Sequence, residues 1–185
     1  MIRIGHVNRR VGWKRDVLVA SLPVVEKLTT GVVSVSWVDP DFRCATHPCW
    51  HYRIGLGTKP PVDLSFDELS GRLAEAQLVL QDESVPAREV FARSVPLESG
   101  CPVVDISDWG DNRYYLDRYY EPEIGWDSLG ALGVRIASSA MSPICEYDFG
   151  NLRMLADKDS RIVGIRFLGI GDDQRLIIRQ AMTGM

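Results

Sequence analysis

The chain has 185 residues, of which 45% are hydrophobic and 25% are charged, so it can bury a core of its own without disulfides or a metal. Its formal net charge of −4 disfavours a nucleic-acid coat protein, because phosphate binding depends on an excess of Lys and Arg. No apolar run approaches the roughly 20 residues that span a bilayer, and no signal peptide is recognisable. We therefore expect a single cytoplasmic domain over residues 1–185, with no membrane partner.

Alternating apolar and polar residues predict three strands near the N-terminus, over residues 1–7, 32–38 and 50–56. The second and third of these segments are also rich in β-branched or aromatic residues, which favour strands. Between the first two strands, apolar residues at helical spacing predict a short helix that begins near Asp16 and ends before Gly31.

A helix is predicted over residues 65–81. Ser65 and Glu68 have the spacing of a capping box, in which each side chain bonds to the other's backbone amide at the start of a helix. The apolar residues that follow repeat at helical spacing and would form one stripe against a sheet. These residues are Phe66, Leu69, Leu73, Ala76 and Leu80.

The last third of the chain reads as a meander of antiparallel strands. Five strand-like segments are separated by short turns, and parallel strands would need longer crossovers. The segments are 134–137, 144–149, 152–156, 162–168 and 176–180. The sequence thus predicts an α+β protein with a β-rich, mostly antiparallel sheet, which could curve into a barrel, one packed helix at about 65–81 and a C-terminal β-meander.

Four potential metal ligands are concentrated in the loop 44–51, namely Cys44, His47, Cys49 and His51. Thiolate and imidazole ligands suit zinc, but structural zinc sites usually draw their ligands from two separated pairs, and this loop is a single short stretch. Cys49 beside His47 or His51 could instead form a nucleophile and base. We favour a compact loop without metal, and we predict no cofactor.

The segment 108–127 combines tyrosine and tryptophan side chains with many carboxylates. Such side chains can line a pocket, where a carboxylate acts as acid or base. They can equally form a protein interface, because Tyr and Trp supply rigid contact area. Burial of the aromatic rings in the core is the third explanation for the same composition.

The candidate site residues come from this segment and from the strand 50–56. Asp117 or Glu121 would be the base and Tyr115 or Tyr119 the acid, with His51 added from the strand. The candidate ligand-binding residues are Arg53, Trp109 and Trp126.

No Ser nucleophile elbow, P-loop or HExxH motif is present, so the sequence does not decide whether the protein is an enzyme. Our leading hypothesis is a protein that binds a small organic molecule and carries out a metal-free acid–base step of the isomerase, cyclase or lyase type. The alternative is a regulatory subunit or inhibitor that uses residues 108–127 to bind a basic protein partner. A third possibility is a metal-binding protein centred on residues 44–51.

Overall fold

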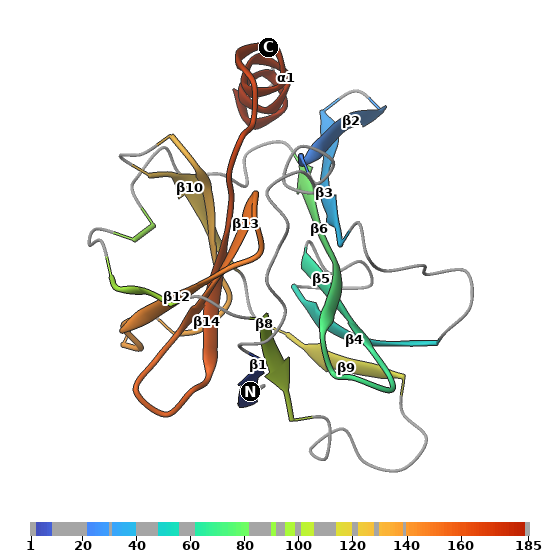
Figure 1. The fold of residues 1–185 in the computed structure, drawn as a ribbon. Helices are drawn as coiled ribbons and strands as arrows, with labels where there is room; N and C mark the ends of the chain where they lie inside the picture. The colour runs from blue at the N-terminus through green and yellow to red at the C-terminus, as the bar shows by residue number, and fades with distance from the viewer. Residues whose placement is uncertain are drawn as a thin grey trace.

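The fold is taken from a computed structural model. It describes residues 3–8, 22–29, 31–39, 48–55, 62–81, 90–91, 95–98, 101–105, 114–119, 122–127, 130–138 and 140–183. Within these residues the chain forms two six-stranded sheets, one two-stranded sheet and one helix (Figure 1). The β-rich, mostly antiparallel α+β class predicted from the sequence is confirmed. No helix in the described segments is long and apolar enough to cross a membrane.

The C-terminal sheet contains the predicted meander. Strands β12, β13 and β14 follow one another as antiparallel neighbours, and β11 adds to the free side of β14. The short strand β7 pairs with β12 in parallel. In spatial order the strands are β10 (Glu123–Trp126), β11 (Leu132–Arg135), β14 (Ile162–Phe167), β13 (Leu152–Ala156), β12 (Cys145–Asp148) and β7 (Leu97–Glu98).

The N-terminal sheet is built from five strands within residues 24–81 and one strand, β9, from the aromatic and acidic segment 108–127. The predicted strand 32–38 is confirmed as β3, and the predicted strand 50–56 is confirmed over residues 50–54, which lie in β4. Strand β9 pairs with β4 in parallel at the edge. The sheet is open, with β2 and β9 as its edge strands. In spatial order the strands are β2 (Val24–Thr29), β3 (Val32–Val38), β6 (Leu73–Gln81), β5 (Val62–Asp67), β4 (Cys49–Ile54) and β9 (Tyr115–Arg118).

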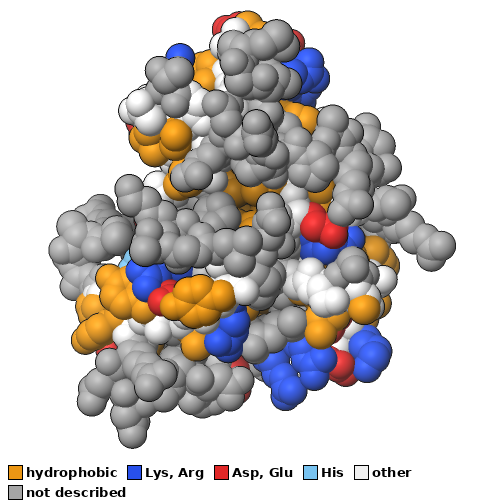
Figure 2. Space-filling model, turned by 180° about the vertical axis from the view of Figure 1, so that it is seen from behind, with side chains coloured by type: hydrophobic (Ala, Val, Ile, Leu, Met, Phe, Trp, Pro, Cys, Tyr) orange, Lys and Arg blue, Asp and Glu red, His pale blue; other side chains and the backbone are white. Residues whose placement is uncertain are grey.

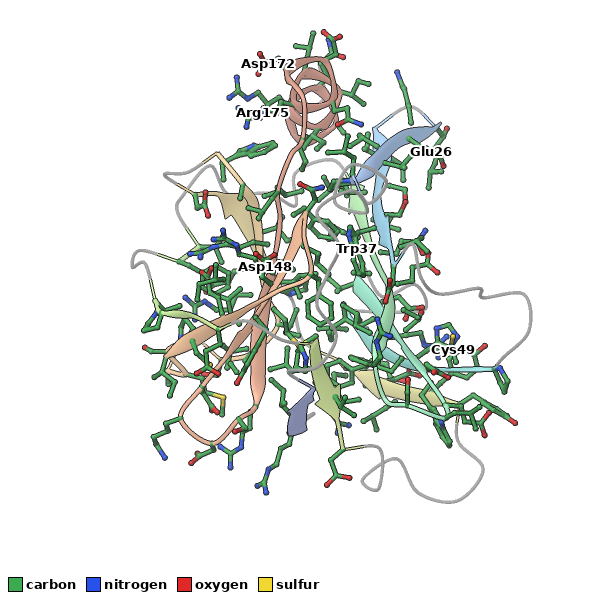
Figure 3. The ribbon with its side chains drawn as sticks, in the orientation of Figure 1. Glu26, Trp37, Cys49, Asp148, Asp172 and Arg175 are labelled. Carbon is green, nitrogen blue, oxygen red and sulfur yellow. The ribbon has the colours of Figure 1, made fainter. Side chains whose placement is uncertain are left out.

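The two larger sheets pack against each other around a shared core. Trp37 on β3 lies between them and meets Phe149 edge-on, with ring centroids 5.9 Å apart (Figure 3). Both rings are almost completely buried, as expected for the largest apolar side chains of a core. The small antiparallel sheet of β1 (Ile4–Asn8) and β8 (Cys101–Val104) contributes Ile4 and Val104 to the same core.

The helix predicted over residues 65–81 is wrong, because this segment forms the β5–β6 hairpin. Leu69, which the helical stripe would have buried, is 77% exposed at the turn. The Asp67 carboxylate accepts hydrogen bonds from the Leu69 amide and the Ser70 hydroxyl, and Gly71 has a φ of 66°, a conformation that favours glycine. These local bonds make a tight turn where the periodicity predicts helix.

Within the described residues the chain forms one helix, α1 (Asp172–Thr183). The sequence predicts a strand over residues 176–180 at this place. That prediction is wrong. Asp172 and Asp173 occupy the first helical turn, where acidic side chains interact favourably with the helix dipole. Ile178 and Ala181 lie three positions apart and bury one face of the helix.

The short helix predicted before Gly31 is also wrong over its described part, where residues 24–29 form the edge strand β2. The remainder of that prediction, residues 16–21, lies outside the described residues.

The outer face of the C-terminal sheet carries a buried charge network. Arg166 pairs with Glu146 and with Asp127, and the Nε to Oδ2 distance to Asp127 is 3.0 Å. Glu146 also pairs with Arg153 at 3.1 Å. The ring of Phe91 lies against this network, 5.2 Å from the Arg166 guanidinium. The charges compensate one another, as buried ions must.

Candidate functional site

Two rows of side chains cross the outer face of the N-terminal sheet. In each row, the members are opposite one another in adjacent strands, so their side chains are neighbours. The histidine row consists of Tyr115, His51, Ser65, Glu75 and Val38. The arginine row consists of Asp117, Arg53, Asp63, Gln77 and Ser36. The alternate residues of the same strands, including Tyr52, Ile54 and Leu64, are buried in the core, which places both rows on the outer face.

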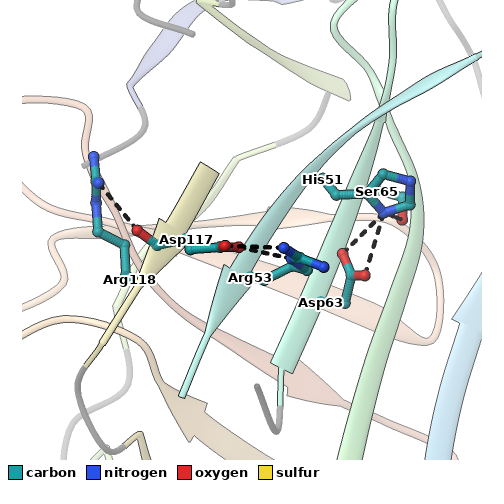
Figure 4. A network of polar contacts seen from close by, with 6 residues as sticks. All are labelled: His51, Arg53, Asp63, Ser65, Asp117 and Arg118. Carbon is teal, nitrogen blue, oxygen red and sulfur yellow. Dashed lines mark hydrogen bonds and ion pairs between the residues drawn. The ribbon is translucent and has the colours of Figure 1, made fainter. Parts of the chain in front are cut away.

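His51 is held by its Nδ1 atom. This nitrogen lies 3.2 Å from each carboxylate oxygen of Asp63 and 3.1 Å from the Ser65 hydroxyl oxygen (Figure 4). An ionised carboxylate only accepts hydrogen bonds, so the arrangement favours a proton on Nδ1. No described residue bonds to Nε2, which in this tautomer carries a lone pair. An oriented imidazole of this kind can accept a proton from a ligand.

Arg53 and Asp117 form a bidentate ion pair that joins β4 to β9. Nε of Arg53 donates to one carboxylate oxygen at 2.7 Å and Nη2 donates to the other at 2.9 Å (Figure 4). The hydrogen bond to Asp117 raises the pKa of Arg53. Because both Asp117 oxygens are bound, this pair fixes the edge strand rather than leaving a carboxylate open to a ligand.

Tyr115 covers the histidine from the edge strand. Its ring stacks on the imidazole of His51 with the centroids 5.0 Å apart, and the guanidinium of Arg53 lies 4.2 Å from the same ring. The Tyr115 side chain is nevertheless 51% exposed. It can therefore offer both an aromatic surface and a hydroxyl to a molecule that binds over His51.

The structure brings four of the predicted site residues together: His51, Arg53, Tyr115 and Asp117. Tyr119 follows the end of β9 and is 71% exposed. Trp126 lies on β10 in the other sheet, where the Arg175 guanidinium is 5.7 Å from its ring. Two further candidates, Trp109 and Glu121, lie outside the described residues.

Three residues of the site were not predicted: Asp63, Ser65 and Glu75. The sequence does contain a signal for the first two, because residues 62–67 alternate strictly between apolar and polar side chains. Interpreting Ser65 as a helix cap concealed that alternation. Once β5 is recognised as a strand, Asp63 and Ser65 must share one face.

Two cysteines, Cys49 and Cys145, lie in described strands. Cys49 shares the outer face of β4 with His51, and Cys145 is buried in β12, where burial raises the pKa of its thiol. Among the described residues, no group of three His, Cys, Asp or Glu side chains is placed to hold a metal. Cys44 and His47 lie outside those residues, so the metal hypothesis for 44–51 stays a prediction.

A basic patch lies on the other sheet. Lys and Arg side chains gather at the lower right of Figure 2, over the turn between β13 and β14. Here Lys158 and Arg161 surround Asp159, with Arg3 nearby, and the hydrogen bond from Lys158 lowers the pKa of that carboxyl. The Asp159 carboxylate partly neutralises these positive charges.

Comparison with protein-family models and with curated proteins found no match to this chain.

Proposed function

We propose that the protein binds a small organic molecule over the outer face of the N-terminal sheet and exchanges a proton with it through His51. The observation that supports this most strongly is the contact of Nδ1 with Asp63 and Ser65, while no hydrogen bond joins Nε2 to another residue in the described part of the chain. A carboxylate behind an imidazole fixes its tautomer and stabilises the imidazolium that forms when the ring takes a proton. The reaction would be an acid–base step of the isomerase, cyclase or lyase type.

The roles of the predicted residues change in this proposal. His51 is the base, and Asp63 is a positioning residue that acts through it. Asp117 holds Arg53 and the edge strand. Tyr115 provides the surface on which the ligand stacks, and its hydroxyl is available as a hydrogen-bond donor.

Solvent-deuterium exchange tests the proposal across a range of candidate substrates. A panel of small ketones, aldehydes, lactones and keto acids is incubated with the protein in D2O, and loss of the C–H signal is followed by ¹H NMR. We expect at least one compound to exchange faster with wild type than with His51→Asn. His6→Asn, on the separate strand β1, serves as the matched control and should match wild type. Equal rates for wild type and His51→Asn across the panel would overturn the proposal.

The second candidate function is binding of a basic protein through the edge strand β9. It is favoured by the exposure of Tyr114, Tyr115 and Tyr119 in or beside this strand. Such binding would weaken with added salt, because residues 108–127 contain six acidic residues against two arginines. Tyr119→Ala would then weaken capture of the partner while leaving ketone exchange unchanged, whereas the leading proposal predicts no salt-sensitive partner.

A further inference from the structure

Glu75 occupies a distinctive place in the histidine row. It lies on β6 directly opposite Ser65, which in turn lies opposite His51. Within the described residues, no hydrogen bond reaches the Glu75 carboxylate. Partial burial raises the pKa of Glu75, repulsion from the Asp63 carboxylate raises it further, and attraction to His51 opposes the rise. The carboxyl therefore keeps its proton at a higher pH than an ordinary glutamic acid.

We propose that Glu75 is the proton donor that works opposite His51, and that the substrate is an uncharged carbonyl compound that can enolise. This inference rests on the proposed function. Strands β4 and β6 are two strand spacings apart, or about 10 Å. The two side chains thus stand on either side of Ser65, leaving room between them for a molecule of a few bonds. A base at one end and an acid at the other are what enolisation requires.

The charges of the site indicate an uncharged ligand. Asp63, Asp117 and Glu75 lie on the same face as Arg53, and the only cation among these four side chains is already bound to Asp117. A carboxylate or phosphate placed over His51 would be repelled by Asp63 and by any ionised Glu75, and the charge of Arg53 is already balanced by Asp117. The same face accepts a neutral carbonyl group without this penalty.

The proton transfers balance. His51 Nε2 takes a proton from the carbon next to the carbonyl, and the electron pair of that C–H bond forms the C=C bond of the enol. The carbonyl oxygen takes the proton of the Glu75 carboxyl. The protein is left with an imidazolium and a carboxylate, and the reverse transfer restores both. If the proton on His51 exchanges with D2O before it returns, the carbon acquires deuterium.

The test compares Glu75→Gln with wild type, using acetone and cyclohexanone as uncharged probes and pyruvate as the anionic one. We expect the uncharged ketones to exchange at least about 100-fold more slowly in Glu75→Gln, the usual scale of general acid catalysis. Glu26→Gln, an exposed position on β2 of the same sheet, should match wild type. Pyruvate should show no exchange above the protein-free rate. The ratio of the wild-type rate to the Glu75→Gln rate should fall as the pH rises through the pKa of Glu75, because only the protonated carboxyl donates and every other group is present in both proteins.

A second measurement does not depend on turnover. The Glu75 carboxyl carbon is titrated by ¹³C NMR, and we expect Asp63→Asn to lower its pKa and His51→Asn to raise it. A pKa that neither variant moves would overturn the pairing of Glu75 with His51.

The outcomes separate the two proposals. Exchange that depends on His51 but not on Glu75 would overturn this inference alone. No exchange above the His51→Asn rate on any compound would overturn the proposed function together with it. Exchange of pyruvate above the protein-free rate would overturn the substrate class.

Discussion

Replacing Asp117 with alanine should release the edge strand β9 without unfolding the protein. The Arg53–Asp117 pair has two charge-assisted hydrogen bonds of 2.7 and 2.9 Å, and about a third of each side chain is exposed to solvent. Solvent screening limits such a pair to about 1 kcal/mol. The Arg53–Tyr115 contact, which depends on the same guanidinium position, adds about 0.5–1 kcal/mol.

The total of about 1–2 kcal/mol applies to local opening of the strand, so amide exchange in β9 should become about 5- to 30-fold faster. Hydrogen exchange followed by mass spectrometry over residues 114–119 measures this directly. Leu116 and Arg118 should respond most, because their amides face β4 in the parallel ladder. Asp159→Ala removes an exposed carboxylate from the other sheet and should leave β9 unchanged. An unaltered exchange rate in Asp117→Ala would refute the view that this ion pair fixes the edge strand.

Three further predictions concern stability, each measured by chemical denaturation. Gly164→Ala should destabilise the fold by about 1–3 kcal/mol, because the new Cβ would lie 2.3 Å from Cζ of Phe91 and 2.8 Å from the Val134 carbonyl oxygen. An unchanged denaturation midpoint would contradict the packing of Phe91 against Gly164. Arg166→Ala should cost about 3–5 kcal/mol, since it leaves two buried carboxylates without this partner, and a loss below about 1 kcal/mol would show that the network is not buried. Glu75 has a raised pKa in the folded state, so between the ordinary pKa of Glu and the raised one the folded protein binds more protons than the unfolded chain. The stability of the wild-type protein should therefore fall as the pH rises across that window, relative to Glu75→Gln. Parallel pH profiles of stability for the two proteins would refute the raised pKa.

Strands with strict alternation could be predicted from the sequence. Residues 32–38 and 50–54 contain β-branched or aromatic side chains at every second position, a pattern that favours a strand. The β5–β6 hairpin was mistaken for a helix because Ala76 and Leu80 are four residues apart, a separation that fits one face of a helix and also one face of a strand. The turn, with its hydrogen bond to the Asp67 carboxylate and the positive φ of Gly71, favours the hairpin over the helix.

The site could be predicted only in part, for a physical reason. His51 and Arg53 were placed on one face because they are two residues apart in a strand. Their partners come from other strands, and Asp117 is 64 positions away from Arg53 in the chain. No local pattern specifies that β9 adds in parallel to β4, or that β5 and β6 extend the rows to Glu75. These pairings depend on the packing of the whole sheet.

The central claim is that His51 presents an unprotonated Nε2 on the outer face of the N-terminal sheet, oriented by Asp63. Long-range ¹H–¹⁵N correlation NMR identifies which ring nitrogen carries the proton in the neutral imidazole. We predict a proton on Nδ1 and a lone pair on Nε2 in the wild-type protein, with Asp63→Asn shifting the ring toward the other tautomer. A proton on Nε2 in the wild-type protein would contradict the account.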